Sequence, residues 1–154
     1  IDGVRASQIF SMAMVVSSAA MLIAQFLVVQ RYAGPPMRLL RRGLPFICLG
    51  YALLANATTL PTLLLAMSLF GFGMALTASA LAASATMAVQ SNEQGGLAGL
   101  LGSTAGLGFM IGPLVGGGLY RISPSYPYWC AAAIMFAVIV FLFTQGQREG
   151  SQAK

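Results

Sequence analysis

Few residues in this chain could carry out chemistry, and none are grouped for catalysis. The 154 residues include no His, three Asp or Glu, eight Lys or Arg and two Cys. Acid–base catalysis, nucleophilic triads and metal sites depend on grouped His, Cys, Asp or Glu side chains. The sequence therefore predicts a protein that is not an enzyme and holds neither a metal nor a cofactor.

Polar and polarisable side chains recur at helical spacing in two segments. The first segment carries Ser11, Met14, Ser18 and Gln25, and the second carries Phe70, Met74 and Thr77. Hydroxyl and amide groups offer hydrogen bonds, while methionine and aromatic surfaces adapt to varied apolar partners. These seven residues are predicted to bind a small-molecule substrate. The alternative interpretation is that they hold neighbouring helices together.

Long stretches without charge must position these residues. Hydrophobic residues make up 58% of the chain and charged residues only 7%. A helix needs about 20 apolar residues to cross a bilayer. The uncharged windows 6–30, 94–120 and 122–147 each fit one crossing, and the window 43–92, interrupted at 56–61 by NATTLP, fits two. We expect an all-α membrane protein, a polytopic helical bundle with transmembrane spans near 8–30, 43–58, 61–88, 96–120 and 127–145.

The few charges predict an orientation in the membrane. Four arginines gather between the first two spans, at positions Arg31, Arg38, Arg41 and Arg42. The positive-inside rule places such a segment in the cytoplasm. The remaining cations are scattered, and eight cations spread among apolar blocks make no basic stripe for nucleic acid.

One acidic residue lies in a predicted cytoplasmic loop. Glu93 precedes a glycine-rich span. A carboxylate there can stabilise the N-terminus of a helix, or it can pair with Arg41 or Arg42 and close a cytoplasmic gate. An exposed ion pair of this kind contributes about 0–1 kcal/mol.

The fourth predicted span is unusually rich in glycine. Gly108, Gly112 and Gly116 follow one another at four-residue spacing, and Gly117 and Pro113 lie among them. Small residues at this spacing let two helices approach closely in lipid. We expect a close helix crossing and a kink near 109–113, either as a static bend or as a moving hinge.

These motifs resemble a known family. The stretch GFMIGPLVGG at 108–117 is similar to the G-x-x-x-G-P-x-x-G-G signature of the major facilitator superfamily (MFS), especially its drug/proton antiporter branches. The segment RYAGPPMRLLRRG lies where that family carries its G-x-x-x-D-R-x-G-R-R loop, but it lacks the acidic residue. Such transporters consist of two six-helix halves. The resemblance, together with a start that lacks an initiator Met, implies that residues 1–154 are the last five helices of a twelve-helix protein.

The resemblance implies a function and a set of partners. We expect a secondary active transporter that works by alternating access in the inner cell membrane, and that exports hydrophobic or neutral small molecules. The predicted spans contain no Asp, Glu, Lys, Arg or His, which disfavours a strongly charged solute. The expected partners are the lipid bilayer, the solute and the missing N-terminal half, with a proton as candidate coupling ion. The alternative is a non-transporting membrane protein, a sensor or assembly factor that keeps the fold.

Overall fold

The described part of the chain folds into five long α-helices. The computed structural model describes the backbone of residues 3–152 and the side chains of residues 3–144. The helices are α1 (Gly3–Ala24), α2 (Pro36–Ala55), α3 (Leu60–Met87), α4 (Gln94–Ile122) and α5 (Tyr126–Gln152), and α1 continues into a π-helical turn, η1 (Gln25–Val29). No strand occurs in this described part. The predicted all-α membrane bundle is therefore confirmed.

The helix boundaries follow proline and threonine signals. Pro35 is extended and Pro36 opens α2, so α2 starts seven residues before the expected span and includes Arg38, Arg41 and Arg42. The turn after α2 ends at Thr59. Thr59 and Thr62 cap α3 reciprocally, each side chain accepting a hydrogen bond from the other residue's backbone N–H, at 3.4 and 3.3 Å.

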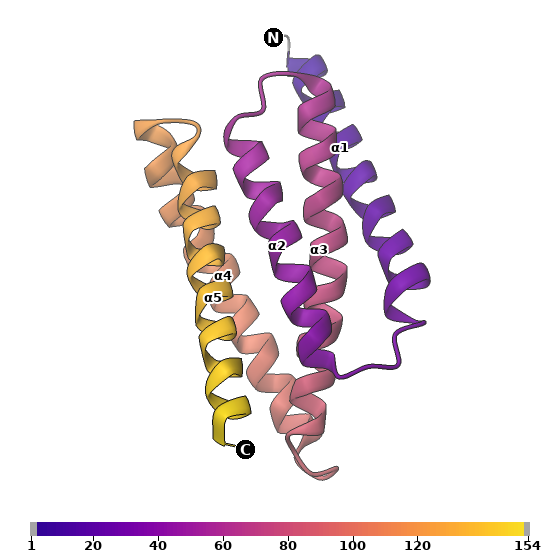
Figure 1. Cartoon of the computed structure of the whole chain (residues 1–154). Coiled ribbons are helices and arrows are strands. Elements are labelled where there is room, and N and C mark those ends of the chain that lie inside the picture. Colours follow the sequence, from indigo (N-terminus) through magenta and orange to yellow (C-terminus); the bar gives the residue numbers. More distant parts are fainter. Residues whose placement is uncertain (1–2, 153–154) are drawn as a thin grey trace.

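Four of the helices can cross a membrane by length and composition: α1 with η1, α3, α4 and the apolar part of α5. The arginine-bearing α2 is not among them. The loop that carries Arg31, the loop that carries Glu93 and the end of α5 all lie at one end of the bundle (Figure 1). This arrangement agrees with a polypeptide that alternates between two sides of a membrane.

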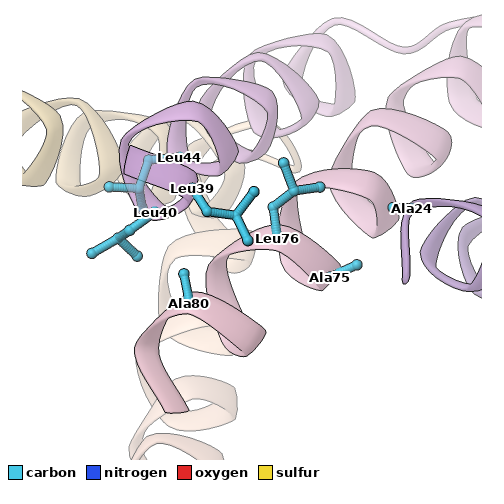
Figure 2. Packing of buried hydrophobic residues seen from close by; sticks show 7 residues of the cluster. All are labelled: Ala24, Leu39, Leu40, Leu44, Ala75, Leu76 and Ala80. Carbon is cyan, nitrogen blue, oxygen red and sulfur yellow. The ribbon is translucent and has the colours of Figure 1, made fainter. Parts of the chain in front are cut away.

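The helices stand side by side, with α3 between α1 and α2, and with α5 on the other side of α2 (Figure 1). The tightest core lies where α2 meets α3 (Figure 2). Its buried residues are Ala24, Leu39, Leu40, Leu44, Ala75, Leu76 and Ala80. Residues of α5 pack against this core from the α2 side.

Glycines bring the backbones of α1, α2 and α3 together. A methyl group on Gly73 would lie 2.8 Å from the backbone nitrogen of Ile47, and one on Gly50 would lie 3.1 Å from that of Phe70. A methyl group on Gly71 would overlap the carbonyl oxygen of Ser17 in α1. These helices therefore approach at distances that only glycine allows.

The glycine-rich α4 does not use its glycines in this way. None of its residues is buried, and a methyl group on Gly108, Gly112, Gly116 or Gly117 would meet nothing within 4 Å. The expected close crossing is thus wrong for contacts within this chain. The reason is that no described helix lies against that face, since α4 runs beside α5 and barely touches α3. The helix continues without a break through Pro113.

Candidate functional site

Two aromatic pairs define opposite sides of the α2–α3 contact. The rings of Phe46 and Phe72 lie 5.1 Å apart, and those of Tyr51 and Phe70 lie 5.3 Å apart. The side chains of residues two positions apart on an α-helix point in directions about 200° apart around the helix axis. Phe70 and Phe72 therefore point to opposite sides of α3, and each pair marks one side.

The helix α5 lies on the Tyr51 side. The thiol of Cys48, three positions before Tyr51, lies 3.5 Å from the carbonyl oxygen of Ala132 in α5. Cys48 is two positions from Phe46 and so points away from it. Hence the side marked by Tyr51 and Phe70 is partly enclosed by α5, and the side marked by Phe46 and Phe72 faces away from α5.

Five of the predicted substrate residues share the Tyr51 side. Ser18 lies two positions from Val16 and Ala20, which both border a cavity on the Phe46 side. Ser18 therefore points away from that cavity, as Phe70 does on α3. Ser11 and Met14 precede Ser18 by seven and four positions, so the three residues share one side of α1. Met74 lies four positions after Phe70 and shares its side of α3. We call this set the solute face: Ser11, Met14, Ser18, Phe70 and Met74.

The solute face is open to its surroundings. Met14 is 43% exposed and Met74 is 36% exposed. The hydroxyl of Ser11 donates to the carbonyl oxygen of Ser7 at 2.9 Å, so its lone pairs stay free to accept. The face thus offers thioether, aromatic and hydroxyl groups and no charge.

The other two predicted substrate residues lie in helix contacts. Gln25, at the start of the π-helical turn, accepts a hydrogen bond from the hydroxyl of Ser79 in α3 at 3.1 Å. The hydroxyl oxygen of Thr77 is buried beside Gly43 of α2 and has no hydrogen-bond partner among the described residues. The structure therefore places Gln25 and Thr77 between helices and not on the solute face.

Sequence reasoning missed the cavity on the Phe46 side. It has a volume of about 490 Å³ and is lined by Val16, Ala19, Ala20, Ile23, Phe46, Leu65, Ser68, Leu69 and Phe72. Its one polar side chain, Ser68, donates its hydroxyl to the carbonyl oxygen of Leu64 at 2.8 Å. A stripe of polar residues is a visible signal in a sequence, whereas an apolar lining contributed by three helices is not.

The family model of the Major Facilitator Superfamily matches residues 2–154. The chain belongs to this superfamily. No curated protein and no solved structure matches it. Members of this superfamily are membrane transporters and not enzymes.

The gate residues predicted for this MFS transporter are not paired in the structure. The guanidinium group of Arg41 lies over the ring of Phe143, 5.9 Å from its centre. The carboxylate of Glu93 accepts a hydrogen bond from the backbone nitrogen of Gln90 at 3.3 Å and makes no capping bond to α4. Arg42 is exposed. The ion pair is thus not formed in this conformation, whereas Glu93 lies at the N-cap position of α4, where its charge favours the helix N-terminus.

The transporter also shows no metal-binding chemistry in its described residues. No three His, Cys, Asp or Glu side chains come together there. Both cysteines are free thiols, Cys48 half-buried and Cys130 exposed. The groups available for recognition are therefore the neutral side chains of the solute face and the arginines at the end of α2.

Proposed function

We propose that the protein is a secondary active transporter of the inner cell membrane that exports hydrophobic or neutral small molecules, coupled to an ion gradient. The observation that carries this proposal is the solute face, which presents thioether, aromatic and hydroxyl groups on α1 and α3. Binding at such a face moves the transporter between inward-open and outward-open states only if the contacts differ between those states. Exposed methionine and aromatic surface on two adjacent helices can supply that difference for varied apolar molecules.

The absence of charge from residues 6–30 and 60–87 supports a neutral solute. Residues 6–30 and 60–87 contain no Asp, Glu, Lys, Arg or His. A charged solute in a membrane-embedded site needs a counter-charge, because transferring an unpaired ion out of water costs several kcal/mol or more. These two segments offer none, whereas they suit a molecule held by dispersion and a few hydrogen bonds.

We propose further that these helices are the last five of a twelve-helix transporter, whose other half carries the coupling acid. The support is that α4 is apolar and glycine-rich, and yet has no buried residue in this chain. Glycines at 108, 112 and 116 offer a smooth face to a helix of the other half. A proton is the proposed coupling ion, taken up by an acid outside these helices.

A matched pair of substitutions on α1 tests the proposed solute face. Ser18 and Ala20 are two positions apart and point to opposite sides. The full-length protein is reconstituted in vesicles, and uptake of a neutral fluorescent dye is followed under an imposed proton gradient. We expect Ser18→Trp to reduce the initial rate at least tenfold and Ala20→Trp to stay within twofold of the wild type.

Other outcomes would redirect the proposal. Loss of transport in Ala20→Trp alone would move solute binding to the cavity on the Phe46 side. No flux of any neutral dye under proton or sodium gradients would favour the non-transporting alternative, a sensor or assembly factor. Equal loss in both variants, with normal folding, would show that neither side is specific.

A further inference from the structure

One arginine of α2 is held in an unusual position. Arg41 is half-buried, and its Nε atom is buried with no hydrogen-bond partner among the described residues. Its guanidinium group lies over the ring of Phe143 in α5, 5.9 Å from the ring centre. A planar guanidinium stacked on an aromatic ring is oriented while its terminal N–H groups remain able to donate. The structure thus fixes this cation without neutralising it.

The position of Phe143 places Arg41 at the membrane boundary. In the sequence of α5, Thr144 is followed by the polar residues QGQREG, so Phe143 lies one residue from the end of the apolar stretch. The phosphates of lipid headgroups lie at this level. Arg38 and Arg42 are exposed, and they are three positions before and one position after Arg41 on the same helix. Three positive charges therefore gather at one edge of the bilayer.

No carboxylate among the described residues pairs with these arginines. The loop between α3 and α4, which carries Glu93, lies at the same end of the bundle as the start of α2 (Figure 1), but the carboxylate of Glu93 accepts from the backbone nitrogen of Gln90. Among the described residues, the buried Nε atom of Arg41 has no hydrogen-bond partner. A cation at this depth that has no partner among the described residues can be stabilised by an anion from the membrane itself.

We propose that Arg41, together with Arg38 and Arg42, binds the phosphate of an anionic phospholipid. The surface beside Phe143 supports a lipid over a free anion. A groove of about 240 Å³ is lined there by Ile139, Val140, Phe143 and Thr144 of α5, and it is almost entirely apolar. An acyl chain can lie along this groove while its headgroup meets Arg41. Inorganic phosphate has no acyl chain that could occupy the groove.

Native mass spectrometry of the full-length protein in mild detergent tests this site. The probes are phosphatidylglycerol and phosphatidylcholine with the same acyl chains, added separately at the same concentrations. We expect the wild type to bind phosphatidylglycerol at least fivefold more tightly than phosphatidylcholine. Arg41→Gln should weaken phosphatidylglycerol binding at least fivefold, in line with the contribution of one arginine near an anionic surface.

Two further variants separate the site from general effects. Arg121→Gln removes the same charge from the last turn of α4 and should change binding less than twofold. Arg41→Lys keeps the charge but loses the stacked planar group, so it should weaken binding by less than Arg41→Gln does. Because Arg41→Lys preserves the cation, it tests the site even where Arg41→Gln folds poorly.

Soluble glycerol phosphate distinguishes the source of the phosphate. We expect no displacement of phosphatidylglycerol by glycerol phosphate at millimolar concentration. Full displacement would overturn the lipid assignment in favour of a site for a free anion. Unchanged phosphatidylglycerol binding in a folded Arg41→Gln variant, or an equal loss in Arg121→Gln, would overturn the site altogether.

Discussion

The substitution Gly73→Ala tests the close approach of α2 and α3. The added methyl group would lie 2.8 Å from both the backbone nitrogen and the Cγ1 atom of Ile47, and 2.9 Å from the carbonyl oxygen of Gly43. Carbon atoms in favourable contact are about 3.5–4.0 Å from their neighbours. The two helices must therefore separate by roughly 1 Å, because two of the three contacts are to backbone atoms that cannot rotate away.

The expected cost follows from two opposing terms. Overpacking a tight contact costs about 1–3 kcal/mol, and replacing glycine by alanine inside a helix regains up to about 1 kcal/mol. Gly99→Ala in α4 is the matched control, because a methyl group there would meet nothing within 4 Å. The helix-propensity gain cancels between the two variants. Gly73→Ala should thus be less stable than Gly99→Ala by about 1–3 kcal/mol.

Unfolding of the full-length protein in mixed micelles, titrated with sodium dodecyl sulfate, measures this difference. A gap of 1.4 kcal/mol corresponds to a tenfold change in the folding equilibrium. If Gly73→Ala unfolds at the same detergent fraction as Gly99→Ala, or at a higher one, the helices are not held at the distance that the structure shows.

The remaining predictions concern a hydrogen bond, a glycine of α4 and a cysteine of α2. Removing the Ser79–Gln25 hydrogen bond should cost about 0.6 kcal/mol, and at most about 1.7; a double-mutant cycle with Gln25→Ala and Ser79→Ala measures this coupling, and a coupling of zero would show that the bond contributes nothing. Gly112→Leu should leave the packing of these five helices intact, since its surroundings are open, but it should abolish transport by separating the two proposed halves; wild-type dye uptake in this variant would contradict that interface. Cys48→Ala should cost less than about 1.5 kcal/mol, because its thiol is a weak donor at 3.5 Å; a larger loss in the same detergent titration would show a stronger role.

The overall fold was predictable because lipid imposes simple demands on a sequence. A helix that crosses a bilayer must be long and apolar, so the charge-free windows are visible without a structure. The start of α2 was less visible. Its first turns carry three arginines, and only the pair Pro35 and Pro36 indicates that the helix begins there.

The packing of the helices was not predictable from glycine density. The densest glycines, in α4, meet open space, whereas Gly43, Gly50, Gly71 and Gly73 make the close contacts. The positions of these four glycines along the helices were the useful signal for close packing. Gly43 and Gly50 are seven positions apart, so they lie on the same face of α2. A small-residue motif shows that a helix can be approached closely, but not which helix will approach it.

The candidate site was predictable in part. Helical spacing grouped Ser11, Met14 and Ser18 on one side of α1, because that periodicity holds in any regular helix. Gln25 followed the same spacing, but it lies at a π-helical turn and hydrogen-bonds to α3. Thr77 lies seven positions from Phe70 and so on the same face of α3, but at its level α2 covers the helix at Gly43. Local periodicity cannot show which part of a helix face a neighbouring helix covers.

The most direct test of the proposed transport mechanism is thiol labelling in vesicles that contain the full-length protein. In a cysteine-free background, Met14→Cys places a thiol on the solute face, and Val16→Cys places one on the opposite side of α1. If the solute face alternates between the two sides of the membrane, a membrane-impermeant maleimide should label Met14→Cys, and a transported dye should slow that labelling at least threefold. Val16→Cys should react slowly, with no response to the dye. Labelling and dye protection at Val16→Cys, with none at Met14→Cys, would contradict the account.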